Sequence, residues 1–459
     1  MERALTHRVF RLPFGLSLSL SLALAAPAVA APGSAPSEFV LPETLSLDDA
    51  VHLFRAHGYD LLIADSQVKS AEGDLASAAA VPNPTFTAGG SYTFEHTSTG
   101  FHSYGDINHG GRVDTPWGGY FTLGDGNALE DAISGKRGLR KRVAQAVLSA
   151  SRLGRADAER QLEYQVKSQY IDALLARDQL DFAGEIQKGT TQTYELMHVR
   201  LLAGAVSEAD EAKVETAKLE ADQAVDEATE QLRVAKLGLA FLLGVRGSTP
   251  VFHVDQDLPA YRVPPGLGMT TSDTLIHDAI ERRPDLRIVD KLRESDEAKL
   301  VLARRLRVPD LNLNMGYQQQ AGTTASAAQP PTFTFGLGGT LPLLYAQRGE
   351  IMKAEAAVKQ DQIQRAKLAA QITTDVETAW THFQSTRVRL ERMQGRLLDR
   401  AKRARDLIEI QYKKGAASLL ELLDAQRTFI AINEEYYQDL ANYWTAIFQL
   451  EQAVGMELR

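Results

Sequence analysis

Two carboxylates near the end of the chain could act on ions. Glu421 and Asp424 lie three residues apart in a helical pattern, so both side chains fall within about 60° on one helix face. In an oligomer with a central pore, such pairs would form an acidic ring that selects for cations. Two simpler roles remain open: Glu421 can cap the helix that restarts at Ser418, and Asp424 can pair with Arg427.

Other chemistry is sparse. His96, His102 and His109 are spaced by six and seven residues in a Gly-rich loop over 96–112, which is not the ligand spacing of a formed metal site. We expect a solvated outer loop and no metal or cofactor. No HExxH motif, Gly-rich phosphate loop or nucleophile–base set occurs, so we do not expect an enzyme.

Composition excludes several classes. The 459 residues contain no cysteine, which removes disulfides, thiolate metal sites and a lipidated N-terminal cysteine. The net charge of −9 argues against a nucleic-acid partner.

A repeated turn organises the chain. Gly415 interrupts a long helical pattern, and Ser418 restarts it with Glu421 three residues later, which is the signature of a capping box. The same turn occurs 211 residues earlier, at Gly204, Ser207 and Asp210. The offset holds across a whole helical hairpin, with Gly138, Gly204 and Gly244 matching Gly349, Gly415 and Gly455. The chain is therefore predicted to be a duplication.

The N-terminus indicates export. Arg3, Arg8 and Arg11 precede an apolar run over 12–26 and a small-residue site ending at Ala30, which predicts a signal peptide over 1–30. An extended leader is expected over 31–45. The first repeat then covers 46–245, a linker covers 246–271 and the second repeat covers 272–459.

Each repeat has the same plan. The first is predicted to hold a helix over 46–80, strands at about 84–95 and within 113–133, and a helical hairpin over 136–243. The second holds a helix over 272–307, strands at about 310–318 and 332–341, and a hairpin over 348–455. Apolar and small polar residues alternate in the clearer strands, as in Phe86-Thr87-Ala88-Gly89, which is the period of a strand with one buried face.

Any membrane crossing must use these strands. No run of about 20 apolar residues follows the signal peptide. Four strands cannot close a barrel, and open edges in hydrocarbon leave backbone groups unpaired. Two copies would supply eight strands and three copies twelve. An aqueous lumen needs the wider barrel, so we expect a homotrimer in outer-membrane lipid. A soluble periplasmic coiled-coil scaffold is the alternative from another class.

The chain resembles the TolC family of outer-membrane efflux proteins. The resemblance rests on Arg283-Pro284-Asp285-Leu286, the stretch from Tyr412 to Gln426, and the closing Leu450 to Gly455. It implies a mainly α fold with membrane β: a trimeric 12-stranded β-barrel continuous with a 12-helix α-barrel. It also implies a periplasmic adaptor (a membrane fusion protein) and an inner-membrane RND-type pump as partners. Gly135-Lys136-Arg137 and Leu341-Pro342-Leu343 look most like the heavy-metal-efflux branch.

The resemblance also suggests roles for single residues. Asp424 and Glu421 would narrow the periplasmic aperture and select cations, and Tyr412 and Asp210 would form a gate contact. The alternative for Tyr412 is packing in the coiled-coil seam. The turns would dock the adaptor through Gly204, Ala205, Gly415 and Ala416. The expected function is a passive exit duct, for heavy-metal cations; drug or organic-solute efflux and type I secretion are the alternatives within the fold.

Overall fold

A computed structural model describes residues 41–458 except 93, 98–99, 104–116, 249–250, 255–256, 269, 322–329, 341 and 343. The predicted signal peptide, most of the leader and His109 lie outside the described residues. Among the residues described, no helix is both long enough and apolar enough to cross a membrane.

Four antiparallel strands, two from each predicted repeat, form one sheet. They are β2 (Thr85–Tyr92), β5 (Trp117–Gly124), β7 (Asp310–Ala321) and β8 (Thr332–Thr340), in the order β2-β5-β7-β8. The register places Phe121 beside Tyr317 and Tyr317 beside Phe333, so apolar side chains share one face. Thr122, Gly316 and Thr334 share the other face. The sheet therefore has one apolar face and one small, polar face.

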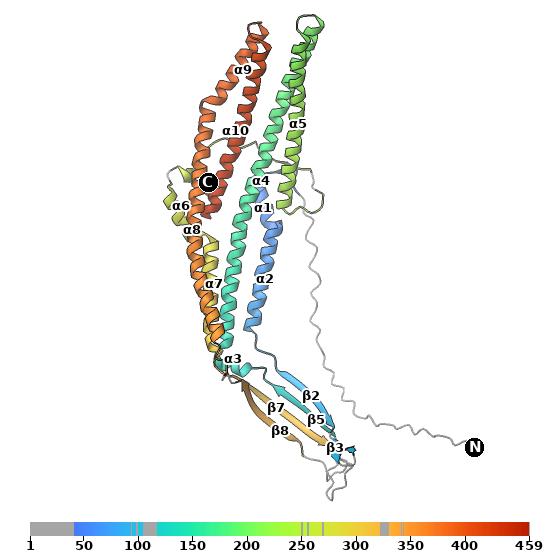
Figure 1. The fold of residues 1–459 in the computed structure, drawn as a ribbon, viewed down its shortest axis with the longest axis vertical. Helices are drawn as coiled ribbons and strands as arrows, with labels where there is room; N and C mark the ends of the chain where they lie inside the picture. The colour runs from blue at the N-terminus through green and yellow to red at the C-terminus, as the bar shows by residue number, and fades with distance from the viewer. Residues whose placement is uncertain are drawn as a thin grey trace, which may run out of the picture. The chain divides into compact units, whose positions relative to one another are not determined.

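Two long helical hairpins follow the strands (Figure 1). The first consists of α4 (Lys136–Leu202) and α5 (Glu208–Leu242). The second consists of α8 (Arg348–Arg392), a π-helical turn η2 (Met393–Leu397), α9 (Leu398–Lys413) and α10 (Leu419–Val454). The π turn corrects the prediction of an unbroken helix in the second half; α4 has no such turn.

The shorter elements are α1 (Leu47–His57), α2 (Tyr59–Ala79), α3 (Ala128–Ser134), α6 (Ser272–Arg282), α7 (Pro284–Arg305) and the 3₁₀ turn η1 (Pro265–Leu267). A short parallel pair joins the leader to the linker, β1 (Thr44–Leu45) with β6 (His253–Val254). A second small pair, β3 (Phe94–Thr97) with β4 (Gly100–Ser103), replaces part of the loop that the sequence predicted.

Two helices predicted to be continuous are broken. The helix over 272–307 bends at Arg283, whose ψ of 125° is non-helical because the ring of Pro284 excludes the helical conformation in the residue before it. The helix over 46–80 bends at Gly58, also with ψ 125°. A Cβ at Gly58 would lie 2.6 Å from the Phe54 ring, so the bend requires glycine. The strand predicted within 113–133 is β5, which ends at Gly124, and α3 begins at Ala128.

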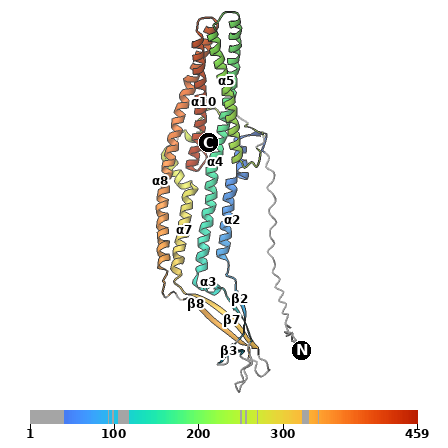
Figure 2. The ribbon, with the colours of Figure 1, turned by 45° about the vertical axis from the view of Figure 1, so that its right-hand side comes forward.

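The helices pack side by side in two rows. The two outermost helices of each row belong to different predicted repeats. Toward the hairpin tips, α5 packs on α4, α4 on α10 and α10 on α9. Nearer the sheet, α2 packs on α4, α4 on α7 and α7 on α8, as Figure 2 shows. Each row, like the sheet, therefore begins with an element of the first predicted repeat and ends with an element of the second.

A buried lysine fixes the sheet to the helices. Lys136 begins α4 and is 2% exposed, and its Nζ lies 2.7 Å from Glu130 Oε1 and 3.1 Å from the Val308 carbonyl oxygen. It also donates to Asp310, the first residue of β7. Desolvated ions need such partners to be tolerated, so this cluster holds the start of α4 against the start of β7.

Candidate functional site

The hairpin tips are built by glycines that no other residue would replace without strain. Gly204 and Gly415 have φ of +71° and +74°. The N–H of Ala416 donates to the Gln411 carbonyl at 2.8 Å, and the N–H of Ala205 donates to the Arg200 carbonyl at the same distance. Both helices thus end in the left-handed glycine motif that satisfies their last carbonyl groups.

The next helices restart with side-chain caps. Ser418 Oγ accepts from the Glu421 N–H at 3.3 Å, and Glu421 Oε2 accepts from the Ser418 N–H at 2.7 Å. The N–H and the hydroxyl of Ser418 lower the pKa of Glu421. Ser207 and Asp210 repeat part of this arrangement, since Ser207 Oγ accepts from the Asp210 N–H at 3.1 Å. The structure therefore forms the predicted cap and engages the Glu421 carboxylate in it.

Asp424 differs from Glu421. It is exposed on α10, one turn from the tip, and makes no ion pair or hydrogen bond with the described residues. Arg427 lies three residues after Asp424 and was its predicted alternative partner. In the structure Arg427 pairs with Glu220 at 3.4 Å instead. Asp424 therefore presents a free carboxylate beside the tip.

The two predicted gate residues do not meet in this structure. Tyr412 Oη donates to Met197 Sδ at 3.2 Å, and its ring packs on the apolar cluster that joins the hairpins near their tips. That cluster consists of Met197, Val214, Leu419 and Leu422. Asp210 accepts from Ser207 and pairs with Lys213 at 3.3 Å. The arrangement of Tyr412 matches the alternative, packing in the seam.

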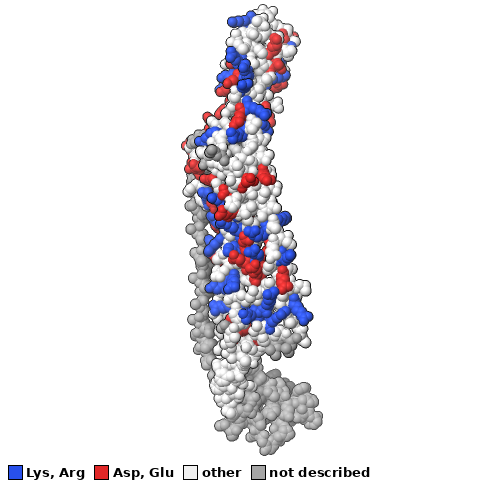
Figure 3. Space-filling model, turned by 90° about the vertical axis from the view of Figure 1, so that its left-hand side faces the viewer, with Lys and Arg blue, Asp and Glu red and all other residues white. Residues whose placement is uncertain are grey.

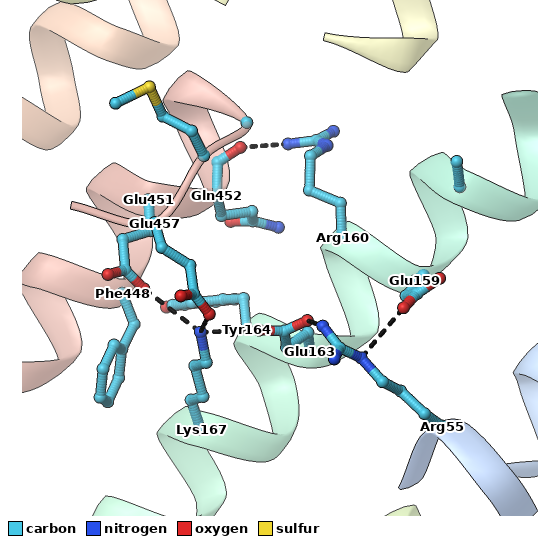
Figure 4. Close-up of a pocket in the computed structure, with 13 residues that line it drawn as sticks. Arg55, Glu159, Arg160, Glu163, Tyr164, Lys167, Phe448, Glu451, Gln452 and Glu457 are labelled. Carbon is cyan, nitrogen blue, oxygen red and sulfur yellow. Dashed lines mark hydrogen bonds and ion pairs between the residues drawn. The ribbon is translucent and has the colours of Figure 1, made fainter. Parts of the chain in front are cut away.

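A charged pocket lies between α1, α4 and the end of α10 (Figure 4). Lys167 Nζ lies 2.7 Å from Glu163 Oε1 and 3.3 Å from Glu451 Oε2. Arg55 contacts Glu163 at 2.7 Å and Glu159 at 3.0 Å. Sequence reasoning missed this pocket because its residues come from three distant segments, although the spacing of Glu159, Glu163 and Lys167 by four residues was a visible signal.

The charges in this pocket neutralise one another. Burial alone would raise the pKa of Glu163, but its contacts with Lys167 and Arg55 outweigh burial and hold the pKa below its ordinary value. The pocket therefore anchors three helices. Among the described residues, no group of three or more His, Asp or Glu side chains is placed to hold a metal ion.

Surface charge separates the sheet from the helices. β2, β5 and β8 contain no charged residue, and β7 contains only Asp310. In Figure 3, Lys, Arg, Asp and Glu side chains cover the helical part and thin out toward the strands. An uncharged sheet with an exposed apolar face is the pattern expected of strands in contact with lipid.

Comparison with known proteins identifies the family. The outer membrane efflux protein family matches residues 50–245 and 275–456. The cobalt-zinc-cadmium resistance protein CzcC of Cupriavidus metallidurans is 22% identical, over 97% of this chain and 99% of CzcC. The pyoverdine export outer membrane protein OpmQ of Pseudomonas aeruginosa is 24% identical, over 89% of this chain and 84% of OpmQ. A solved structure of CusC superposes with a TM-score of 0.71 and 18% identity, covering 92% of this chain and 96% of CusC.

The chain belongs to the outer membrane efflux protein family, as the resemblance to TolC predicted. It is an efflux protein of the outer membrane, with its helical part in the periplasm. The relatives named above are channel, export and resistance proteins.

Proposed function

We propose that three copies of this chain form the outer-membrane exit duct of a tripartite efflux system, which conducts substrate passively. The sheet is the observation that carries the proposal. Phe335 on its apolar face is 80% exposed, and β2 and β8 are paired on one side only within the described residues. Each unpaired backbone group in hydrocarbon costs several kcal/mol, so β8 of one copy must pair with β2 of the next.

The helical rows support the same ring. Their free edges are α5 and α9 near the tips and α2 and α8 near the sheet. Joining first-repeat edges to second-repeat edges around three copies would give twelve strands and a tube of twelve helices. We retain repeats over 46–245 and 272–459 as part of this proposal. The family match in two segments, 50–245 and 275–456, supports this division.

The partners proposed are an adaptor and an RND-type inner-membrane pump. The tips at Gly204-Ala205 and Gly415-Ala416 would receive the adaptor, because small residues allow a partner backbone to approach closely. Leu202 and Leu420, beside the tips, are 77% and 70% exposed. These apolar side chains would be covered in the assembled system.

Heavy-metal cations are the proposed substrate. Asp424 supports this choice, since three copies of a free carboxylate near the tips would form a ring that attracts cations. Glu421 would contribute less because its carboxylate already serves the cap. The likeness to CzcC supports the metal substrate, whereas the likeness to OpmQ favours an organic solute as the second candidate.

Planar-bilayer conductance tests the aperture. Asp424→Asn should weaken block by divalent cations added on the periplasmic side and lower the preference for K⁺ over Cl⁻. Glu435→Gln is the matched control, because Glu435 is an exposed carboxylate farther along α10. Equal behaviour of both variants and the parent protein would rule out the Asp424 aperture.

Two cellular measurements separate the alternatives. Outer-membrane fractionation should give a heat-modifiable trimer, and a soluble monomer would favour the coiled-coil scaffold. A deletion strain should lose tolerance to heavy-metal cations. If its metal tolerance is unchanged and the cells accumulate an organic solute instead, the organic solute is the better candidate substrate.

A further inference from the structure

A band of exposed cations lies where the helices meet the sheet. We call it the basic collar, and it consists of Lys141 and Arg142 near the start of α4, Arg305 at the end of α7 and Arg348 at the start of α8. All four side chains are exposed, and none makes an ion pair with the described residues. In Figure 3, Lys and Arg side chains gather at this end of the helical part, next to the strands.

The carboxylates near the basic collar serve other groups. Three sets of ion pairs use most of them: Asp131 with Arg140, Glu130 and Asp310 with Lys136, and Glu355 with Arg304. Asp125 accepts from three backbone N–H groups. Glu350 is exposed but lies about 160° around α8 from Arg348. The basic collar therefore stays positively charged in a chain whose net charge is −9.

On α4, the basic collar lies on the side of the sheet's apolar face. Asp310 shares the polar face of the sheet with Gly316, because side chains of a strand alternate between its two faces. Lys136 donates to Asp310 and so marks the polar side at the start of α4. Lys141 and Arg142 lie about 140° and 120° around the helix from Lys136, in opposite directions. Both cations therefore point away from the polar side.

The same surface continues across α7 and α8. Arg142 and Val301 line one groove between α4 and α7. Arg305 follows Val301 by four residues and lies about 40° from it around α7. On α8, Arg348 lies about 20° around the helix from Glu355, which pairs with a cation of α7. The four cations therefore form one surface over three helices.

An apolar loop lies between the basic collar and the sheet. Leu344 and Tyr345 connect β8 to α8, and Leu344 is fully exposed while Tyr345 is 53% exposed. Arg307 Nε donates to the carbonyl of Ala346 at 3.0 Å, which holds this loop against the end of α7. Tyrosine is enriched where a membrane meets water, because its ring is apolar and its hydroxyl is polar. Exposed apolar side chains next to cations are the pattern expected at the level of lipid headgroups.

We propose that the basic collar binds the phosphate groups of anionic phospholipids in the periplasmic leaflet of the outer membrane, with Leu344 and Tyr345 at the boundary of the acyl chains. This inference rests on the proposed membrane sheet and adds the class of lipid that its periplasmic end selects. The helical part lies in the periplasm, so the junction of helices and sheet faces that leaflet.

Distance and chemistry both suit phosphate. Arg142 lies six residues after the start of α4, or about 9 Å along the helix. The attraction between a cation and an anionic membrane surface acts within a Debye length, which is about 10 Å at 0.1 M salt. A guanidinium group also binds phosphate oxygens through two parallel N–H donors, and three of the four collar residues are arginines.

Lipid selectivity of the reconstituted full chain tests the basic collar. The protein is placed in phosphatidylcholine vesicles with a trace of spin-labelled phosphatidylglycerol or spin-labelled phosphatidylcholine, and electron paramagnetic resonance measures how much of each label the protein immobilises. The parent protein should prefer phosphatidylglycerol several-fold. Raising NaCl from about 0.05 to 0.5 M should reduce this preference, because salt screens the charges.

Charge removal supplies the second arm. A triple variant without most of the collar should lose most of the preference: Arg142→Gln, Arg305→Gln and Arg348→Gln. A control variant loses the same charge at three exposed cations of the hairpins that make no ion pair with the described residues, and it should keep the preference of the parent: Arg233→Gln, Arg400→Gln and Arg403→Gln.

The depth of the apolar loop is measured separately. The chain contains no cysteine, so Leu344→Cys can carry a single fluorophore. Spin-labelled lipid should quench this fluorophore strongly. It should not quench the same fluorophore at Leu202→Cys, an equally accessible control beside a hairpin tip that is 77% exposed. Quenching at position 344 by aqueous iodide alone would overturn the placement of the loop at the membrane.

The outcomes separate the basic collar from the duct. A heat-modifiable trimer in the vesicles that shows no preference for phosphatidylglycerol would overturn the collar and leave the proposed duct intact. A preference that ignores salt, or that survives in the triple collar variant, would also overturn the collar. Absence of any membrane-inserted trimer in the parent protein would overturn the duct and the collar together.

Discussion

Replacing a tip glycine by alanine should loosen the tip by a predictable amount. Gly415 has φ of +74°, and a Cβ added there meets no atom within 4 Å. The effect of Gly415→Ala is therefore purely conformational, since an L-residue in the left-handed region costs roughly 1–2 kcal/mol. Gly204→Ala should behave in the same way, because Gly204 has φ of +71° and equal clearance.

Hydrogen exchange followed by mass spectrometry measures this local loss. A destabilisation of one or two kcal/mol raises the open population about 5- to 30-fold, so peptides over 408–425 should exchange faster by that factor in Gly415→Ala. Gly184→Ala is the matched control. Gly184 lies inside α4, and an added Cβ again meets no atom within 4 Å. Here alanine should stabilise the helix by roughly 0.5–1 kcal/mol and slow exchange locally.

The two substitutions must differ in sign for the reasoning to hold. If Gly415→Ala exchanges at the parent rate, the left-handed turn is not the dominant conformation of the tip. If Gly184→Ala also speeds exchange, an unrecognised contact at that position governs the result.

Three further outcomes are expected. Lys136→Met leaves two carboxylates without their cation and should destabilise the protein by about 3–5 kcal/mol, measured as a lower midpoint of thermal unfolding by circular dichroism. The folded pKa of Glu421 is lowered, so its cap stabilises the tip above the ordinary carboxyl pKa and loses this effect as pH falls through the lowered value. Ser418→Ala removes the hydroxyl contact but keeps the N–H contact, so it should weaken that acid dependence in tip hydrogen exchange. Glu163 also has a lowered pKa, so its contribution is present at neutral pH and is lost in acid. Lys167→Met removes one of the two cations that contact Glu163, so it should raise the pKa of Glu163 and change the pH dependence of the thermal midpoint; an unchanged pH profile would contradict the assigned ion pair.

Local chemistry made the turns readable from the sequence. Gly204 and Gly415 were predicted at helix ends, and both adopt positive φ there because glycine alone enters that region without strain. Ser418 with Glu421 was recognised as a capping box, since both partners lie within one turn. The strand over Thr332–Thr340 followed from its alternation of polar and apolar residues.

Breaks inside helices were harder to predict. Pro284 is a local signal for the bend at Arg283. The helical pattern of the residues on both sides of it led to the prediction of one continuous helix. The π turn at Met393–Leu397 has no comparable residue signal, and α4 passes the equivalent point without interruption. Its position depends on packing, shown by the burial of Met393 and the hydrogen bond from Gln394 to Tyr436 at 3.0 Å.

Partner choice across the hairpins was decided only by the tertiary structure. Tyr412 reaches Met197, 215 residues away, and Arg427 reaches Glu220 rather than Asp424. Sequence spacing ranks neighbours along one helix, whereas these contacts depend on how two hairpins lie side by side. The sequence by itself determined the turns and their caps, because each depends on residues within one or two helical turns. The tertiary structure decided which carboxylates remain free and which helix edges remain uncovered, because both depend on long-range packing.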